Sequence, residues 1–212
     1  PNIYTINNAL IDSVSSIKYL GVYLNSTLTW TDHIEQITSK AQKKLGYLKR
    51  RLYLADRDTR LEAYNFLVRP SLKYASIIWH PYQITLTNIL ESVQNKVARF
   101  ILSSYSRYQS VSSLKETLNM PSLSVRRKIT RLLYFHTLYH SSTPFTRSHI
   151  FAPPHTSHRV DHAHKVKPIF ARTEKYKHSP LFLLIKEWNE LPPRIATITE
   201  SSLFQSALQA SP

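Results

Sequence analysis

The sequence predicts a mainly α-helical protein in which a short N-terminal β-hairpin precedes a thumb-like bundle of helices. The β-type alternation of apolar and polar residues is confined to the first 28 of the 212 residues. From Thr31 onward, apolar residues recur at steps of three and four, the period of one helix face. The apolar content of 42% is enough for a buried core in one or two domains. We divide the chain into a hairpin region (1–28), a helical bundle (29–140), an irregular basic segment rich in His and Pro (141–179) and a C-terminal helical segment (180–212).

The hairpin is expected from two β-rich runs. Residues Ile3 to Ile11 alternate around Asn7 and Asn8, and a second run extends from Ile17 to Leu24. We expect the two runs to pair. Gly21 lies inside the second run, where a glycine usually marks a bulge or the close approach of another backbone.

One long amphipathic helix is expected over residues 32–54. Asp32, followed three residues later by Glu35, is typical of a capping box at its start. No acidic residue lies between Glu35 and Asp56, and this stretch carries the densest basic block of the chain. The block is either a solvated helix face or a surface that contacts successive nucleic-acid phosphates. Its members are Lys40, Lys43, Lys44, Lys49, Arg50 and Arg51.

A second helix is expected to begin at Asp56 or Asp58 and to reach Arg69. Pro70 should then kink or break it, because proline cannot complete the hydrogen-bond ladder, before the pattern resumes from Leu72 to Trp79. Two aspartates so close together could also hold a metal ion. We interpret them as helix-capping residues, which is the commoner role of aspartate at such a position.

Three further helices are expected before residue 140. The first has Thr85 or Thr87 as its cap, a short helix follows over residues 110–118, and Pro121 suits the first turn of a helix that ends near His140. The last of these helices is expected to expose a second basic cluster, which is a further candidate for a phosphate-binding surface. This cluster consists of Arg126, Arg127, Lys128 and Arg131.

The remainder of the chain is less periodic. A helix is expected from Pro180 to Glu190 and a terminal one from Ser201 to Gln209. The segment before them holds Asp161 and a series of histidines that could form a zinc or nuclease site. We favour a solvated loop, because metal ligands usually stand on a rigid frame with second-shell support. The histidines are His149, His155, His158, His162 and His164.

Three aromatic residues, Trp79, Tyr82 and Trp188, could stack on bases. Their helical spacing beside prolines favours packing in the core instead.

Composition excludes several classes of function. With 2 glycines the chain cannot build a glycine-rich phosphate loop, and without cysteine it has no disulfide, zinc finger or iron–sulfur site. A net charge of +15 favours polyanions, nucleic acid before anionic membrane. Leu181 to Ile185 is too short an apolar run for a membrane helix, and no signal peptide is apparent. We expect an intracellular protein, nuclear or ribonucleoprotein-bound, and, since it starts at Pro1, a piece of a longer chain.

An ordered series of short motifs extends from about residue 15 to residue 208. In chain order they are Tyr19-Leu20-Gly21-Val22; Leu28-Thr29-Trp30-x-x-His33-Ile34; Leu67-Val68-Arg69-Pro70-x-Leu72-x-Tyr74-Ala75; Trp79-x-Pro81; Leu90-Glu91-x-Val93-Gln94-x-Lys96-x-x-Arg99-Phe100; Leu118-x-x-Pro121-x-Leu123 followed by Arg126-Arg127; and Trp188-Asn189-x-Leu191-Pro192 followed by Phe204. In this series the chain resembles the reverse transcriptase of non-LTR, jockey-like (LINE-type) retrotransposons, in the part that follows the catalytic carboxylates.

The resemblance implies that residues 1–28 are the end of the palm and the primer grip, and that residues 29–140 are the thumb and connection bundle. Primer contacts then fall on Tyr19, Leu20, Gly21 and Val22, although an ordinary edge hairpin would look similar. Both basic clusters are then candidates to bind the RNA–DNA duplex. The implied partners are an RNA template, a DNA primer, and the upstream palm and fingers of the same polyprotein, but no membrane.

The palm aspartates that hold two metal ions in such polymerases would precede residue 1. We therefore expect this chain to be inactive alone, with no catalytic or metal-binding residue and no cofactor of its own, and with Mg²⁺ in the parent RNA-directed DNA polymerase. Three alternatives stay open: a stand-alone or degenerate basic helical module that binds nucleic acid, a metal-dependent hydrolase that uses the histidine segment, and a protein-interaction scaffold. Preference for an RNA–DNA duplex would distinguish a thumb from a generic basic module.

Overall fold

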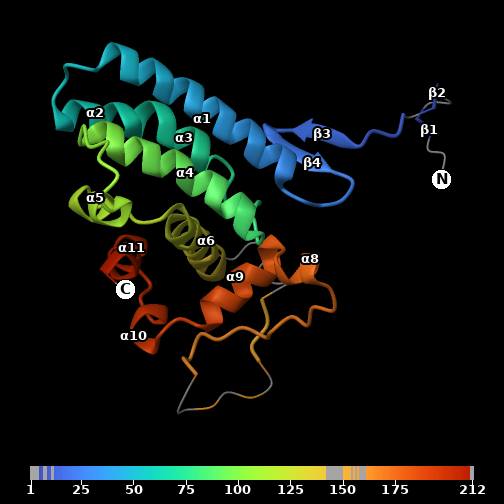
Figure 1. The fold of residues 1–212 in the computed structure, drawn as a ribbon. Helices are drawn as coiled ribbons and strands as arrows, with labels where there is room; N and C mark the ends of the chain where they lie inside the picture. The colour runs from blue at the N-terminus through green and yellow to red at the C-terminus, as the bar shows by residue number, and fades with distance from the viewer. Residues whose placement is uncertain are drawn as a thin grey trace.

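The computed structural model of the protein describes residues 5–6, 9–10, 12–141, 150–153, 155, 157 and 161–210. The mainly helical fold is confirmed (Figure 1). Four short strands come first: β1 (Thr5–Ile6), β2 (Ala9–Leu10), β3 (Ser16–Tyr19) and β4 (Val22–Asn25). The helices are α1 (Thr31–Arg51), α2 (Arg57–Ala63), the π-helix η1 (Tyr64–Val68), α3 (Arg69–Lys73), α4 (Ile84–Ile101), α5 (Val111–Thr117), α6 (Leu123–His140), α8 (Glu174–Lys177), α9 (Pro180–Asn189), α10 (Pro193–Ala196) and α11 (Ser201–Ala210).

The strands form two separate hairpins, and the expected pairing between the two β-rich runs is wrong. β1 pairs with β2, and β3 pairs with β4, both antiparallel. The reason is the two-residue turn between β3 and β4: Leu20 has φ 45° and Gly21 has φ 83°. Positive φ at both central residues is typical of the tight turn that best joins adjacent strands, so Gly21 is a turn residue and not a bulge. The residues Ile3, Asn7, Asn8 and Ile11 of the first run lie outside the described part.

Helix α1 begins at Thr31, but its expected capping box does not form. The N-cap residue is Trp30, which makes no side-chain capping bond. Asp32 instead accepts a hydrogen bond from Asn25 Nδ2 at 3.3 Å, and Asn25 Oδ1 accepts one from the backbone N–H of Thr29 at 2.9 Å. The asparagine at the end of β4 thus fixes the turn that leads from the hairpin into the helix.

The predicted N-cap residue is confirmed for α2 and wrong for α4. Asp56 is the N-cap of α2, and its side chain accepts from the backbone of Asp58 and Thr59. Helix α4 is preceded by Gln83 as its N-cap, without a side-chain capping bond, so neither Thr85 nor Thr87 has that role. The side chain of Thr87 donates back to the Gln83 carbonyl oxygen at 3.3 Å.

Pro70 does not end the second helix, but the α-helical hydrogen-bond pattern is interrupted directly before it. Helix α2 widens into the π-helix η1 directly before the proline, and the N–H of Arg69 bonds the carbonyl of Tyr64, five residues back. Pro70 then stands at the start of α3, where its missing N–H is tolerated. The helix ends at Lys73, and residues 74–78 form turns instead of resuming the helix.

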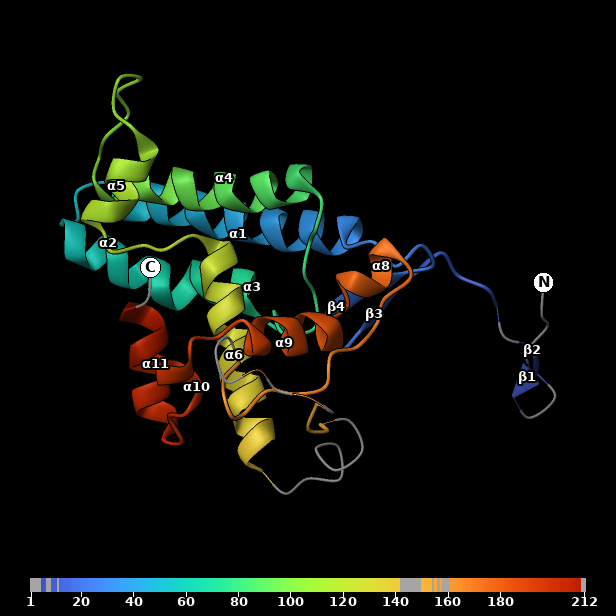
Figure 2. The same ribbon diagram turned by 90° about the horizontal axis from the view of Figure 1, so that it is seen from below.

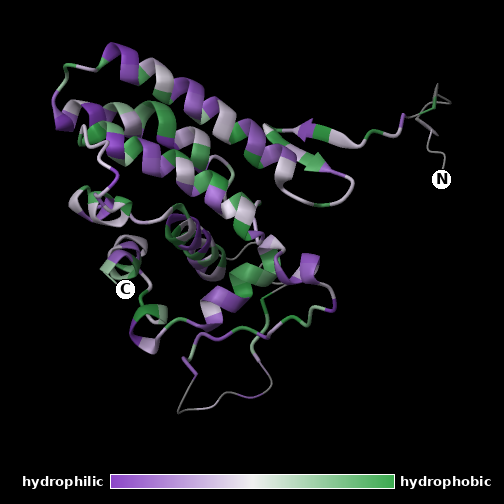
Figure 3. Cartoon of the chain, in the orientation of Figure 1, coloured by the Kyte–Doolittle hydropathy of each residue, from purple (hydrophilic) through white to green (hydrophobic). Residues whose placement is uncertain are grey.

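The core has two buried clusters. The first lies among α1, η1, α3, α4 and α5 and includes Trp79, and the second lies among α6, α9, α10 and α11 around Trp188. In Figures 1 and 2, α1 and α4 run side by side with α2 and α3 against them, while α6 crosses beneath toward α9 and α11. Hydrophobic and hydrophilic residues alternate along each long helix, as amphipathic packing requires (Figure 3). In the described part of the chain, no helix has the length and apolar character needed to cross a bilayer.

The described part of segment 141–179 is not a simple solvated loop. Val166 is buried, and its backbone exchanges two hydrogen bonds with the Asn189 side chain at 2.9 and 2.8 Å. The Trp188 ring nitrogen donates to the His164 carbonyl oxygen at 2.8 Å, and the His162 side chain lies 3.1 Å from the Trp188 carbonyl oxygen. Residues 162–166 are therefore held against α9.

Candidate nucleic-acid interface

A groove of about 330 Å³ lies where the β3–β4 hairpin meets α1 and α3. Its walls are basic, polar, aromatic and aliphatic, and none of the described residues that line it is acidic. The hairpin contributes Lys18, Gly21 and Tyr23; α1 contributes Gln36, Ile37 and Lys40; and α3 with the residue after it contributes Ser71 and Tyr74. The groove thus brings the predicted primer grip and the predicted thumb helix to one place.

Tyr74 fixes the tip of the hairpin. Its hydroxyl donates a hydrogen bond to the carbonyl oxygen of Leu20 at 2.8 Å, across 54 residues of sequence. A Cβ atom added to Gly21 would lie 3.0 Å from Cε1 of the Tyr74 ring, closer than side chains normally tolerate. Glycine is therefore required here twice, for the positive φ of the turn and for the contact with this ring.

His33 anchors the second strand of the hairpin, β4, to α1. Its Nδ1 accepts a hydrogen bond from the backbone N–H of Tyr23 at 3.3 Å, and its ring lies 5.1 Å from that of Trp79. His33 is fully buried, and this burial lowers its pKa from 6.5 to about 4. At neutral pH the ring is uncharged, as its role of hydrogen-bond acceptor requires.

The four predicted primer-grip residues occupy different environments. Tyr19 and Leu20 are exposed, Gly21 lines the groove, and Val22 is buried with 5% of its surface accessible. Val22 packs into the protein as the inward-facing residue of β4, so its side chain offers little surface to a ligand. The exposed apolar tip is formed by Tyr19 and Leu20.

The cations of α1 extend from the groove along the helix. Lys40, Lys43 and Arg51 are exposed. Lys43 and Arg51 follow Lys40 by three and eleven residues, and these spacings place all three cations, with Tyr47, near one face of the helix. The Arg51 guanidinium lies 5.9 Å from the centre of the Tyr47 ring. Arg50 is also exposed, seven residues from Lys43 on the same side of the helix.

Two lysines of this block have other partners. Lys44 donates to the Leu67 carbonyl oxygen and to Ser71 Oγ, each at 2.8 Å, and thereby ties α1 to η1 and α3. Lys49 lies on a different side of α1, 5.9 Å from the centre of the Tyr105 ring. The basic face of α1 therefore consists of Lys40, Lys43, Arg50 and Arg51.

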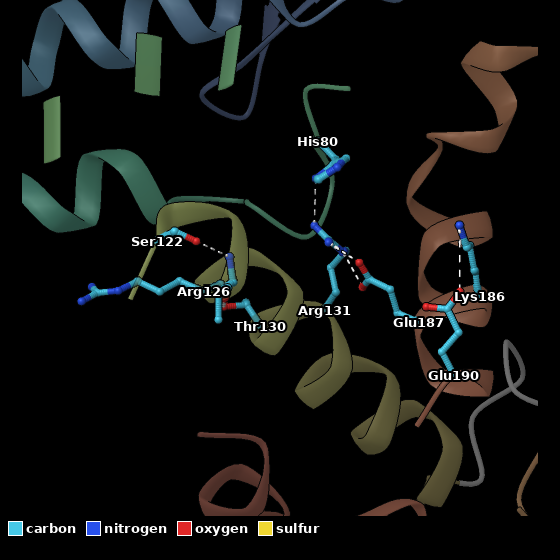
Figure 4. Close-up of polar contacts among 9 residues, drawn as sticks. His80, Ser122, Arg126, Thr130, Arg131, Lys186, Glu187 and Glu190 are labelled. Carbon is cyan, nitrogen blue, oxygen red and sulfur yellow. Dashed lines mark hydrogen bonds and ion pairs between the residues drawn. The ribbon is translucent and has the colours of Figure 1, made fainter. Parts of the chain in front are cut away.

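The second predicted cluster does not form one exposed surface. Arg131 is buried, and its guanidinium pairs with Glu187 of α9, with an Nε to Oε2 distance of 2.9 Å, and lies 3.2 Å from His80 Nδ1 (Figure 4). Burial and the charge of Arg131 lower the pKa of His80 to about 3. Arg127 is buried too, 5.5 Å from the centre of the Trp79 ring. Lys128 alone of the four is exposed.

Packing explains these differences. Arg127 and Arg131 are four residues apart and share the face of α6 that lies against the rest of the protein, where their long stems add to the apolar contact. Arg126 is partly buried on another side of the helix and points away from Arg131 (Figure 4). Four cations within six positions are typical in sequence of a solvated face, but the helix period places them on different sides of α6.

Sequence reasoning missed several groove residues. Lys18, Gln36 and Ser71 carry no local signal, because only the folded hairpin brings them together. Tyr74 and His33 did occur in the motif series, but neither was assigned a role. A tyrosine in a chain turn and a histidine at the start of a helix have too many ordinary uses for one sequence to assign these contacts.

The aromatic and histidine expectations have mixed outcomes. Trp79 and Trp188 are fully buried, as expected of core residues, whereas Tyr82 is partly exposed and stacks on His178 with 4.7 Å between ring centres. In the described ranges, no group of three His, Asp or Glu residues is arranged to hold a metal ion. His149 and His158 lie outside those ranges.

Comparison with known proteins yields one partial similarity. The chain is 29% identical over 106 residues to a probable RNA-directed DNA polymerase from transposon X-element of Drosophila melanogaster. The match covers 48% of this chain and 11% of the length of that relative. No protein-family model matches the chain, and no solved structure matches it significantly. The similarity supports a relationship to reverse transcriptases.

Proposed function

We propose that this chain is the C-terminal part of a retrotransposon reverse transcriptase and holds the primer and the RNA–DNA duplex. The observation that carries the proposal is the groove between the hairpin tip and α1, which has two lysines, Lys18 and Lys40, and no acidic residue in its lining. Tyr74 keeps the tip of the hairpin in place beside it. A duplex that enters the groove can then continue along the basic face of α1.

The chemistry of this face fits backbone binding without sequence readout. Lysine and arginine on one helix face neutralise successive phosphates and release condensed counterions, which gives affinity that falls steeply with salt. An A-form duplex presents a wide, shallow minor groove with its 2′-hydroxyls, so a helix placed there reads shape and backbone. The hydroxyl of Tyr23 is a suitable hydrogen-bond partner for such groups. Ser71, which accepts from Lys44, can still donate, and Tyr74, which donates to Leu20, can still accept.

The rest of the proposal concerns the longer protein. The aspartates that bind Mg²⁺ would belong to an upstream palm, so the chain alone would have no polymerase activity and no cofactor of its own. Its partners would be the RNA template, the DNA primer, and the palm and fingers of the same polyprotein. It would act inside the cell, in the nucleus or in a ribonucleoprotein.

A binding experiment tests the proposal directly. The affinity of the chain for an RNA–DNA hybrid, a DNA duplex and an RNA duplex of equal length is measured between low and physiological salt. We expect the hybrid to bind most tightly, and Lys40→Gln with Lys43→Gln to reduce the slope of log K against log salt by about 2. Lys167→Gln with Lys175→Gln is the matched control, because both lysines are exposed and lie outside the groove and the face.

Two results would contradict the proposal. Equal affinity and slope for all three duplexes would favour the generic basic module, which the net charge of +15 alone would explain. An equal loss in the groove variant and in the control would show that the charge acts without regard to position, and would remove the assignment of α1 as the thumb helix.

A further inference from the structure

A second cleft, larger than the groove, lies between α3, α6 and α11. Its volume is about 500 Å³, within the range of small-molecule sites in proteins. It has a cationic part, an apolar wall and several carboxamides. The cations are Arg69, Lys73 and Arg126; the apolar residues are Pro121, Val125, Ile129, Leu133 and Leu208; and the polar neutral residues are Asn119, Thr130, Gln205 and Gln209.

The cationic part of this cleft lacks a balancing carboxylate among its lining residues. Nη1 of Arg126 is buried without a hydrogen-bond partner, and Figure 4 shows its side chain extending away from the Arg131–Glu187 pair. The charge of Glu91 acts on Arg126, but this carboxylate is already engaged by Lys115 at 3.3 Å and by the Leu123 N–H at 2.7 Å. Burial and the charge of Arg69 both lower the pKa of Arg126.

A fourth cation stands behind these three. Arg127 has 3% of its surface exposed, and none of its three guanidinium nitrogens has a hydrogen-bond partner in the described part of the chain. It lines a water-sized cavity of about 20 Å³, whose walls also include Arg69, Lys73 and Arg126. Burial lowers the pKa of Arg127 to about 10, so the group is still charged at neutral pH. Buried cations without partners are costly, and an oxyanion in the neighbouring cleft would offset the charge of Arg127, which does not line that cleft itself.

We propose that this cleft binds one phosphorylated nucleoside, with its phosphate on Arg69, Lys73 and Arg126. Arginine forks match phosphate oxygens in pairs, and the buried charge of Arg127 adds attraction from behind. A phosphate alone would fill a small part of the volume. The apolar wall offers a surface for a base or sugar, and the carboxamides of Gln205 and Gln209 can pair with the donor and acceptor edge of a base.

This site is distinct from the groove of the proposed function, although both adjoin α3. Arg69 and Lys73 are four residues apart on one face of α3, whereas Ser71 and Tyr74 line the groove on the other side. The ligand is either a free nucleotide or one unpaired nucleotide of a strand. Because the lining residues of the two sites do not overlap, the failure of one proposal leaves the other intact.

Calorimetric titration of the full chain with AMP, adenosine and inorganic phosphate tests the inference. We expect AMP to bind at least about tenfold more tightly than adenosine or phosphate. Lys73→Gln, whose side chain is exposed, should weaken AMP binding about tenfold and leave the thermal midpoint unchanged. Lys128→Gln, an exposed lysine of α6 that lines neither cavity, is the matched control and should bind AMP as the native chain does.

Short oligonucleotides then separate the two sources of the ligand. Tighter binding of a single-stranded tetranucleotide than of AMP, with the same loss in Lys73→Gln, would identify a strand; tighter binding of AMP would identify a free nucleotide. Either result supports the site. The inference is overturned if phosphate binds as tightly as AMP, if Lys128→Gln weakens binding as much as Lys73→Gln, or if none of the probes binds.

Discussion

At the scale of single residues, the two glycines of the chain have opposite roles. Gly21 has φ 83° beside the Tyr74 ring, whereas Gly46 lies inside helix α1, where the nearest atom to an added Cβ is the Arg50 side chain at 3.6 Å. The first position requires glycine, and the second does not. Replacing each glycine by alanine can separate a position that needs glycine from one that does not.

We expect Gly21→Ala to lower the free energy of unfolding by about 1–2 kcal/mol, the cost of a left-handed conformation with a Cβ atom. Gly46→Ala should raise it by about 0.5–1 kcal/mol, because alanine loses less conformational freedom in a helix. Urea unfolding followed by circular dichroism measures both. If the two variants changed stability in the same direction, the turn and the close contact with Tyr74 would not have the strain assigned to them.

The buried His33 predicts a dependence of stability on pH. Its pKa is 6.5 in the unfolded chain and about 4 in the folded protein, so between these values the unfolded chain binds a proton that the folded protein does not. Stability due to His33 is complete above pH 6.5 and is lost as the pH falls through about 4. The slope is about 1.4 kcal/mol per pH unit. Urea unfolding at several pH values measures it.

The variant His33→Phe provides the comparison for this slope. It fills a similar volume against Trp79, cannot titrate, and gives up the bond from the Tyr23 N–H. We expect it to be less stable than the native chain at pH 7 and to lose stability less steeply between pH 6.5 and 4. An unchanged slope would assign the acid sensitivity to another group, of which His80 is the first candidate.

At the scale of elements, the Arg131–Glu187 pair links α6 to α9 inside the protein. Arg131 has 2% of its side chain exposed and Glu187 has 12%, so removal of either partner leaves a charge in a poorly solvated place. The Lys186–Glu190 pair, at the C-terminal end of α9, has both side chains more than half exposed, with 4.0 Å between Nζ and Oε1. The two pairs are drawn together in Figure 4.

We expect Glu187→Gln to destabilise the protein by about 3 kcal/mol, the usual scale when one partner of a buried ion pair is removed. Glu190→Gln, a matched change at an exposed pair, should cost no more than about 0.5 kcal/mol. Thermal or urea unfolding at pH 7 measures both. Costs of equal size would mean that water screens Arg131 as well as it screens Lys186.

The positions of the long helices were largely predictable from sequence, whereas the hydrogen bonds at their ends and at Pro70 were not. Apolar periodicity located α1, α4, α6, α9 and α11 to within a few residues, because each buries one face. It could not show the π-helix before Pro70 or the Asn25 network that replaces the Asp32 capping box, since both depend on hydrogen bonds made after folding. The site was predictable in part: the basic face of α1 follows from the helix period, whereas burial of Arg127 and Arg131 needs the partners Trp79 and Glu187.

At the scale of the whole molecule, α6 joins two cores. Its first residue, Leu123, belongs to the cluster around Trp79, and its later residues Leu132 and Phe135 belong to the cluster around Trp188. The groove and the basic face of α1 adjoin the first cluster, and the second cleft lies where α6 meets α3 and α11. The two proposed sites therefore depend on different parts of the core.

This division predicts a local effect for Trp188→Ala. The ring packs at 5.0 Å from Phe135 and 6.0 Å from Phe204, and its nitrogen holds residues 162–166 through the His164 carbonyl. Loss of a buried tryptophan costs about 3–5 kcal/mol. We expect hydrogen exchange to accelerate in α9, α11 and the later part of α6, while α1 and α4 keep their protection, because their apolar faces are buried against each other. Equal acceleration in all five helices would show that the two clusters unfold as one unit, and binding to the groove would then depend on Trp188 as well.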